Sequence, residues 1–443
     1  MEIIIILGLA FGLRLIAINQ SLWLDEAISA NVAKMPIGEI VKNFSIHDFH
    51  PPVYYWFLNI WNNIFGSEVV FSRVSSILFS LITVYFVYLI GKKIKNKKIG
   101  ILAAFFLAIN PLFVFYSQEL RMYSMATMWL TIGFYFFIKI KNKKYQTKDL
   151  VIFNLMMALA FGTFYGSIFL IASFAIYFLI KKEWKLFWLT NIGIVIAIII
   201  LSPLLLTQIK NSQIMLTEVK NWVLVLGKVN LKNLLLIPLK FSIGKISFYP
   251  KIWYYLVGGG WSLIVLVLIF WKKEKESNWL KLFLIIPIIL AIIFSIKSPL
   301  LQYFRFLYLL PIMALVLAIN IEKKWQKVLV GGGFLIFSLV YLLNPNYYRE
   351  DWKGLTKSLS ECQISNDKCQ IYMISSFSDP IKFYNQNIEI YDLRDEINED
   401  EITVIPYGEL IHGVDHQKIL TNYGYKKTGE KDFRGVFWEK WKK

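Results

Sequence analysis

Three carboxylates lie in short stretches where they could act as a base. Asp25 and Glu26 stand side by side after an apolar Trp-Leu pair, and Glu119 lies in a second stretch, just before Leu120. A carboxylate beside apolar side chains is partly desolvated, which makes it a better proton acceptor. Neighbouring residues diverge by about 100° on a helix, so Asp25 and Glu26 should do different jobs. The structural alternative for Asp25 is the N-cap of a helix.

Arginine is rare in this chain, which has 7 arginines among its 48 basic residues. Residues 1–343 contain Arg14, Arg73, Arg121 and Arg305. A guanidinium is a planar fork that binds phosphate or carboxylate through two hydrogen bonds, whereas a lysine is a point charge. A lysine-rich chain that keeps these arginines is expected to use the fork, so the set of four predicts an anion site. For any single arginine, a plain ion pair explains it equally well.

Two histidines flank Asp48 and Phe49, and the second of them, His50, precedes Pro51-Pro52. His50 could donate a hydrogen bond to a phosphate, whereas His47 is expected to be a surface side chain. The sequence contains no P-loop, Rossmann glycine fingerprint, HExxH or GxSxG motif. An enzyme with this sequence should therefore use a substrate that is already activated.

The composition indicates which elements must position these residues. The chain is 56% hydrophobic and 18% charged, with a mean hydropathy of +0.52, whereas soluble domains carry about 25% charged residues. A single soluble domain, a disordered chain and a disulfide scaffold are excluded. Residues 1–343 hold 34 basic and 13 acidic side chains, and residues 344–443 hold 14 and 17. The positive surplus lies between apolar runs, as membrane orientation signals do, rather than in a nucleic-acid-binding patch.

Apolar runs predict about eleven transmembrane helices. The expected spans are 3–19, 69–91, 99–116, 122–140, 150–165, 167–180, 187–208, 251–271, 280–296, 303–320 and 328–343. Every even-numbered span is followed by lysines, at 92–98, 139–148, 181–185, 272–275 and 323–327. Lysines collect in cytoplasmic loops, so these ends and the N-terminus should be cytoplasmic. We expect the first span to be retained, because it lacks a basic leader and Arg14 interrupts it.

The opposite loops should then lie on the outer face of the membrane. They comprise residues 20–68, 117–121, 209–250 and 297–302, together with the tail from 344. On this topology the four arginines and the three carboxylates share the outer face. Residues 53–58, which follow Pro51-Pro52, should form a short helix in the membrane interface with an aromatic belt.

The tail, residues 344–443, is predicted to be a small extracytoplasmic α/β domain. We expect a helix over 348–359, strands at 371–375, 388–393 and 402–407, and a second helix opening at Asp379-Pro380. Cys362 and Cys369 could form a disulfide outside the cytosol. A zinc site is the weaker alternative, because His412 and His416 make a poor ligand set with two distant thiols.

Several motifs, taken in order, resemble those of the family 39 glycosyltransferases. They are Trp23-Leu24-Asp25-Glu26-Ala27, His50-Pro51-Pro52-Val53-Tyr54-Tyr55-Trp56, Ser72-Arg73-Val74 and Tyr116-Ser117-Gln118-Glu119-Leu120-Arg121-Met122-Tyr123. A later stretch, residues 303–311, resembles the Arg-Tyr…Pro span of that family. The family includes relatives of the protein O-mannosyltransferases and the lipid A aminoarabinose transferases, all with the membrane-embedded GT-C fold. The match is strongest over residues 20–125 and weak in the tail.

The resemblance implies a GT-C catalytic domain over residues 1–343, followed by the α/β domain over residues 344–443. It implies that Asp25 is the catalytic carboxylate, and we place Glu26 in the catalytic site beside it. The residues expected to bind the donor and its phosphate are His50, Arg73, Glu119, Arg121, Tyr123 and Arg305. The aminoarabinose transferases have Lys-Pro-Pro where this chain has His50-Pro51-Pro52, so their acceptor does not carry over.

The resulting hypothesis is a multi-pass glycosyltransferase of the cell membrane. It would transfer a hexose or pentose, with inversion, from a polyprenyl-phosphate donor to a hydroxyl of a protein, lipid or cell-surface glycan. Asp25 would be the base, and no cofactor is expected, since the residues do not require a metal. The partners would be donor, acceptor and bilayer, with no nucleic acid.

Two other classes of protein compete with this hypothesis. A flippase for lipid-linked sugars, or another transporter, should place ionisable groups near the bilayer midplane, where the spans of this chain have almost none. A non-catalytic assembly protein would not need Asp25 together with outward-facing arginines.

Overall fold

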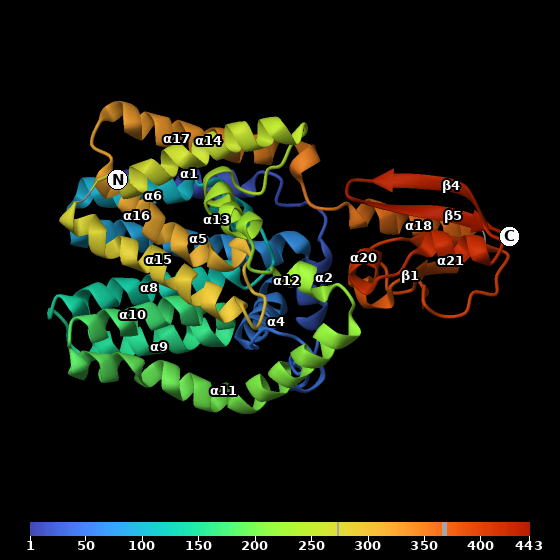
Figure 1. Cartoon of the computed structure of the whole chain (residues 1–443), viewed down its shortest axis with the longest axis horizontal. Helices are drawn as coiled ribbons and strands as arrows, with labels where there is room; N and C mark the ends of the chain where they lie inside the picture. The colour runs from blue at the N-terminus through green and yellow to red at the C-terminus, as the bar shows by residue number, and fades with distance from the viewer. Residues whose placement is uncertain (273, 366–369) are drawn as a thin grey trace.

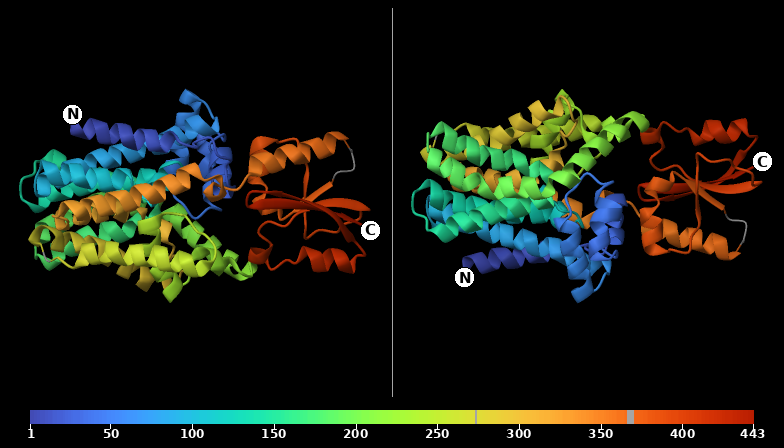
Figure 2. Two further views of the ribbon diagram at one scale, coloured as in Figure 1. Left: turned by 90° about the horizontal axis from the view of Figure 1, so that it is seen from above. Right: turned by 90° about the horizontal axis from the view of Figure 1, so that it is seen from below.

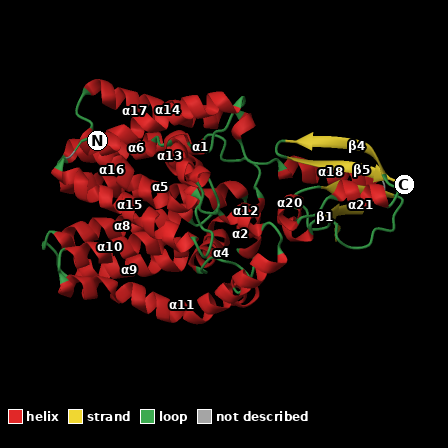
Figure 3. Ribbon diagram, viewed as in Figure 1, coloured by secondary structure: helices red, strands yellow, loops and turns green. Residues whose placement is uncertain are grey.

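The computed structural model describes residues 1–272, 274–365 and 370–443. A bundle of apolar helices fills residues 1–343, and a small domain with a β-sheet follows at one end of it (Figures 1 and 3). The bundle helices are α1 (Glu2–Leu15), α5 (Val69–Ile94), α6 (Lys97–Ala108), α7 (Pro111–Ser117), α8 (Tyr123–Lys141), α9 (Thr147–Thr163), η2 (Tyr165–Ser167), α10 (Ile168–Ile180), α11 (Trp184–Glu218), α14 (Lys251–Phe270), α15 (Lys275–Ser295), η3 (Tyr303–Leu309), α16 (Leu310–Asn320) and α17 (Lys324–Leu343).

Each predicted span overlaps a helix of this bundle, but the predicted number of eleven is not confirmed. Among the described residues, six helices are long and apolar enough to cross a membrane, or seven if the bent pair α6–α7 counts as one. That pair bends by 64°, because Asn110 caps α7 and Pro111 occupies its first turn. The first span is shorter than predicted, since α1 ends at Leu15 and Ala17 has a φ of 56°. The multi-pass membrane architecture is confirmed.

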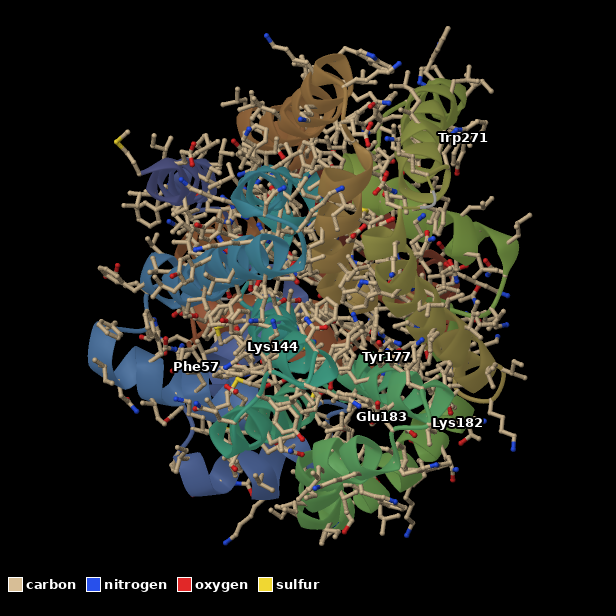
Figure 4. The ribbon with its side chains drawn as sticks, turned by 90° about the vertical axis from the view of Figure 1, so that its left-hand side faces the viewer. Phe57, Lys144, Tyr177, Lys182, Glu183 and Trp271 are labelled. Carbon is tan, nitrogen blue, oxygen red and sulfur yellow. The ribbon has the colours of Figure 1, made fainter. Side chains whose placement is uncertain are left out.

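The two ends of the bundle differ. We call one the lysine end; it consists of the turns at 95–96, 142–146, 181–183, 271–272 and 321–323, and Figure 4 shows Lys144 and Lys182 there. The N-terminus lies at this end (Figure 1). The other, which we call the site end, carries the C-terminal domain. The predicted clustering of lysine turns at one end is therefore correct, while the side of the membrane that each end faces remains a prediction.

Short helices cover the site end. They are α2 (Leu24–Val32), α3 (Ile37–Glu39), the π-helix η1 (Ile40–Ser45), α4 (Val53–Phe65), α12 (Trp222–Leu226), α13 (Leu231–Ile243) and η4 (Pro345–Tyr347). The predicted interfacial helix is the first half of α4. The predicted loop 209–250 does not begin at 209, because α11 continues as one helix to Glu218 and reaches toward the C-terminal domain (Figure 1).

The C-terminal domain has a five-stranded sheet with helices on both faces (Figure 2). Its elements are α18 (Trp352–Ser365), β1 (Gln370–Met373), η5 (Ser375–Phe377), α19 (Asp379–Tyr384), β2 (Ile390–Asp392), β3 (Glu401–Ile405), α20 (Glu409–His412), α21 (His416–Asn422), β4 (Lys426–Phe433) and β5 (Val436–Lys442). The strand order is β2-β1-β3-β5-β4, in which β2, β1 and β3 run parallel and β5 and β4 pair antiparallel.

This sheet confirms the predicted α/β domain, but it has five strands where three were predicted. The three predicted strands match β1, β2 and β3, and Asp379-Pro380 does open α19. The hairpin β4–β5 was not predicted, because its first strand, with the sequence KKTGEKDF, has almost no apolar alternation. Cys369 lies outside the described residues, so its disulfide with Cys362 stays a prediction. No group of three His, Cys, Asp or Glu side chains suited to a metal ion occurs in the described part of the chain.

Helix α2 lies between the two domains. Leu24 belongs to the apolar core of the C-terminal domain, with Trp23 and Ile28 packed against it, whereas Ala27 and Ala30 belong to the core of the bundle. The first turn of α2 holds both Asp25 and Glu26. The two candidate acids are therefore fixed at the boundary of two separate apolar cores.

Candidate active site

Asp25 lies at the site end with its carboxylate partly open to solvent. Its side chain is 35% exposed, while that of Arg121, whose Nη2 lies 3.6 Å from Asp25 Oδ2, is 6% exposed. Arg121 Nη1 also donates to the Asp25 carbonyl oxygen (3.4 Å) and to Ser29 Oγ (3.3 Å). Trp23 occupies the N-cap of α2, so the alternative role of Asp25 as a helix cap is wrong. The Asp25 carboxylate is thus held by one cation and otherwise open.

Glu26, next to Asp25, is fully buried in an ion cluster. Arg73 donates to both of its carboxylate oxygens, from Nε at 2.9 Å and from Nη2 at 2.6 Å. The Leu120 N–H also donates to Glu26 (2.8 Å), and Arg349 Nε lies 3.1 Å away. Burial alone would raise the pKa of Glu26, but the charges of Arg73 and Arg349 hold it below its usual range. Glu26 has no free oxygen with which to meet a substrate.

Arg73 is occupied on every side. Beyond Glu26, its guanidinium donates to the carbonyl oxygens of Ile18 (2.7 Å), Gln20 (2.6 Å) and Ser21 (3.1 Å). This corrects two expectations from the sequence: Glu26 and Arg73 hold the chain before α2 in place, and neither is free to act on donor or phosphate. The buried pair explains why a lysine would not serve here, since its single nitrogen cannot span five acceptors.

Glu119 presents a buried carboxylate that receives no hydrogen bond from the described residues. Its nearest cation is Arg349, whose Nη2 lies 3.6 Å from Glu119 Oε2. Burial raises the pKa of Glu119 to about 7, against the lowering effect of Arg349 and Lys245. Glu119 can therefore carry or release a proton near neutral pH, close to Arg121 and two residues from it in the chain.

His50 is oriented by an acid that the sequence analysis did not single out. Asp48 Oδ1 lies 3.2 Å from His50 Nδ1, and the Tyr55 hydroxyl donates to Asp48 Oδ2 (2.7 Å). Burial would raise the pKa of Asp48, but the His50 contact and the Arg121 charge keep it below its usual range. Because Nδ1 of His50 faces Asp48, Nε2 is the ring nitrogen left to meet a ligand.

Tyr123 and Arg305 are brought together by an aromatic cluster. The Phe304 ring lies 5.4 Å from that of Tyr123 and 6.2 Å from that of Tyr116. This packing places η3 against the start of α8, and Arg305 Nη1 donates to the Leu226 carbonyl in α12 (3.2 Å). The predicted donor residues from three distant parts of the chain thus meet at the site end.

Arg14 does not join this group. Its guanidinium is buried inside the bundle, where Nη1 donates to the carbonyl oxygens of Ala10 and Ala108, each at 2.9 Å. Three of the four arginines therefore lie at the site end in contact with the candidate region, and the fourth ties α1 to α6. Since Arg73 is fully occupied as well, the predicted anion site of four arginines is reduced to Arg121 and Arg305.

Besides Asp48, three charged groups at the site were missed by the sequence analysis. Arg349 contacts both Glu26 and Glu119, and Lys245 places its ammonium over the rings of Trp23 (5.2 Å) and Phe115 (5.1 Å). Burial raises the pKa of Glu350, and the nearby charge of Asp25 adds to that effect. The signal for Arg349 was present, since it is one of the 7 arginines, but it follows the last span.

Comparisons with known proteins bear on the fold. Residues 49–206 match the sequence profile of the dolichyl-phosphate-mannose-protein mannosyltransferases. That range includes His50, Arg73 and the Glu119–Tyr123 stretch, and it ends before Arg305. A search of curated protein sequences finds no match.

Solved structures with a similar fold are membrane glycosyltransferases. ArnT from Cupriavidus metallidurans superposes with a TM-score of 0.59 at 10% identity, over 99% of this chain and 97% of that one. The same protein bound to undecaprenyl phosphate gives 0.58, also at 10% identity and with the same coverage. The Archaeoglobus fulgidus oligosaccharyltransferase, in complex with Zn and sulfate, gives 0.52 at 12% identity, over 87% of this chain and 61% of its own.

These matches settle the fold. The chain has the GT-C fold and resembles the family 39-type glycosyltransferases, as the motifs predicted. At the coarser level, it is a multi-pass membrane protein built like glycosyltransferases that work with polyprenyl phosphates.

Proposed function

We propose that this protein is an inverting glycosyltransferase that takes a sugar from a polyprenyl-phosphate donor and passes it to a hydroxyl acceptor on the outer face of the membrane. The observation that carries the proposal is the contrast between Asp25 and its neighbours. Glu26 and Glu119 are buried, whereas Asp25 is partly exposed beside Arg121, with further donors at His50 and Arg305. A base next to cations is what transfer from a phosphate requires.

The chemistry is a single displacement. An Asp25 carboxylate oxygen accepts the proton of the acceptor hydroxyl as that oxygen attacks the anomeric carbon. The bond from that carbon to the phosphate oxygen breaks, and its electron pair leaves with the polyprenyl phosphate. Attack from the side opposite the phosphate inverts the anomeric centre, and no sugar is bound covalently to the protein. The buried partners of α2 fix the direction of the Asp25 side chain for this step.

The leaving phosphate gains negative charge and needs donors placed beforehand. Arg121 and Arg305 lie at the site end on separate elements, and the His50 ring is oriented by its contact with Asp48. A guanidinium or an imidazolium in a site of low polarity stabilises such charge more strongly than it would in water. Tyr123, packed against Phe304, would line the path of the donor beside them.

No cofactor is part of this proposal, because a carboxylate base and fixed cations supply both requirements of the reaction. The expectation of metal independence is open to direct measurement. Turnover should persist in a chelator such as EDTA, and a loss of turnover that added divalent cations restore would contradict it.

The decisive experiment is turnover of radiolabelled polyprenyl-phosphate sugars by purified protein in lipid. Wild type is compared with Asp25→Asn and with Asp395→Asn, an exposed acid of the C-terminal domain that serves as the control. We expect wild type and the control to release sugar from the lipid, and Asp25→Asn to lose at least about 100-fold in rate, the usual range for a general base.

Other outcomes have definite meanings. Turnover that survives in Asp25→Asn would keep the transferase and move the base to Glu119. If wild type turns over no donor but binds it as well as the variant does, and moves it across vesicle membranes, the protein is a flippase.

A further inference from the structure

The segment that joins the bundle to the C-terminal domain sends one side chain into the site end. Arg349 follows η4, and its side chain is 3% exposed. Its guanidinium lies 3.1 Å from Glu26 and 3.6 Å from Glu119, and it stacks over Phe115 with 4.5 Å to the ring centre. Glu26 lies in α2 and Glu119 lies between α7 and α8, so one side chain reaches two acids that are 93 positions apart in the chain. Arg349 is the cation that these two acids share.

The backbone around Arg349 is hydrogen-bonded to the C-terminal domain. Its carbonyl accepts a hydrogen bond from Arg434 Nε (2.8 Å), and the neighbouring Asp351 N–H donates to the Arg434 carbonyl (2.8 Å). Arg434 lies in the turn between β4 and β5. The Arg349 N–H donates to Gln20 in the segment before α2 (3.1 Å). The backbone that carries the guanidinium is therefore held by the hairpin of the sheet domain on one side and by the segment before α2 on the other.

The same domain also grips both ends of the segment that carries Asp25. Ahead of α2, the Leu22 N–H donates to the Tyr384 hydroxyl (2.8 Å), and at the end of α2 Asn31 Nδ2 donates to Asp379 Oδ1 (2.9 Å). These contacts hold the backbone of α2. Arg349 contacts the two buried acids next to this segment, Glu26 and Glu119.

We propose that Arg349 is a positioning residue, through which the docked C-terminal domain holds Glu26 and Glu119 and so keeps the Asp25–Arg121 pair in working register. The proposal rests on the function proposed above, because it assigns Arg349 a task in that reaction. Arg349 itself is not placed to touch the substrate, since its nitrogens point to Glu26, Glu119, Gln20 and Tyr341.

The charges around Arg349 show why an uncharged side chain of similar size would not replace it. Glu26 keeps Arg73 as a partner when Arg349 is removed, but Glu119 has no hydrogen-bond donor to fall back on. A carboxylate that loses a cation at this distance becomes easier to protonate, typically by about one pH unit or more. A neutral Glu119 would leave the positive charge of Arg121 less compensated, and Arg121 would move relative to Asp25.

The test compares Arg349→Met and Arg349→Lys with Arg394→Met as the matched control. Arg394 lies in the same domain and pairs with Asp392 at its surface (2.7 Å), away from the described acids of the site. The first measurement is steady-state turnover. We expect Arg349→Met to lower kcat by about 100-fold with little change in the KM for the donor, because a displaced base affects the reaction and not donor binding. Arg394→Met should match wild type.

The second measurement follows the protonation of Glu119 directly and needs no turnover. Infrared difference spectra taken across a pH series show the carbonyl band of a protonated carboxyl, and Glu119→Gln identifies the band that belongs to Glu119. We expect its midpoint to rise by about one pH unit or more in Arg349→Met. In Arg349→Lys, which keeps the charge but loses the fork, the midpoint should stay near that of wild type and kcat should recover at least in part.

The outcomes separate this proposal from the proposed function. If wild type transfers no sugar, the proposed function fails, while the infrared series still reports whether Arg349 sets the charge of Glu119. A wild-type kcat in Arg349→Met would overturn the positioning role. So would an unshifted Glu119 band, or an equal loss of kcat in the methionine and lysine variants. If Arg349→Met does not fold, the lysine variant and Arg434→Met, which releases the Arg349 carbonyl, take its place with the same readouts.

Discussion

The lysine end and the site end of the bundle use positive charge in different ways. At the lysine end, Lys97 pairs with Glu2 and Lys143 with Glu183, and all four side chains are open to solvent. At the site end, Arg73 and Glu26 are both fully buried, and Arg349 is shared by two acids. Exposed pairs contribute little to stability, whereas breaking a buried pair leaves an uncompensated charge. The comparison shows that these lysines form exposed pairs at one end of the bundle, whereas the arginines at the other end hold buried acids in place.

Removing the acid at the centre of the buried cluster should have the largest effect. Glu26→Ala leaves Arg73 and Arg349 without their shared partner, at an expected cost of about 3–5 kcal/mol in the free energy of unfolding. Denaturant titration in mixed micelles measures it. The matched control is Glu183→Ala at the lysine end, expected to change stability by less than about 0.5 kcal/mol. Similar losses at both ends would remove the distinction between them.

An exchange of arginine and lysine sharpens the same comparison. Arg121→Lys replaces the fork that contacts both the Asp25 side chain and its carbonyl, and should lower sugar transfer by about 10- to 100-fold. Lys95→Arg, in an exposed pair with Glu274, should change it by less than about twofold. The measurement is the rate of sugar transfer by each variant relative to wild type. Equal tolerance of the two exchanges would mean that the scarcity of arginine carries no functional information.

The same comparison extends to the pH dependence of stability. The folded protein raises the pKa of Glu119 to about 7 from an ordinary value of 4.5, mainly through burial. Between these two pH values the folded state binds more protons than the unfolded state, so the Glu119 contribution to stability falls as pH rises. Glu119→Gln should flatten the curve in that window. Since His416 also titrates with a raised pKa, the difference between variant and wild type is what isolates Glu119. A parallel pair of curves would contradict the assignment.

Much of the architecture could be predicted because it follows from local pattern. Apolar runs and lysine turns gave the helices in order, and the motifs around Asp25 and Glu119 indicated which loops meet. The hairpin β4–β5 escaped because its polar strand is stabilised by pairing with β5 and not by its own pattern.

The division of labour among the charged residues could not be predicted, because it depends on contacts between distant segments. Arg73 and Glu26 are 47 positions apart, and nothing in either motif says that they satisfy each other. Arg349 follows the last apolar span, where nothing in the local sequence indicates that its side chain reaches back to Glu26 and Glu119. Asp48 was overlooked between its two histidines, although a carboxylate two residues before His50 was the signal for an oriented imidazole.

The placement of Leu24 in the core of the C-terminal domain has a consequence for biosynthesis. Ser21 Oγ accepts a hydrogen bond from the Lys353 N–H, 332 positions later in the chain, so the segment before Asp25 waits for a partner that the ribosome makes near the end of translation. A nascent chain can insert its helices and pair Glu26 with Arg73 well before that. The segment that carries Asp25 gains these contacts only when the final domain has been translated and folded, so a prematurely terminated chain is released without them.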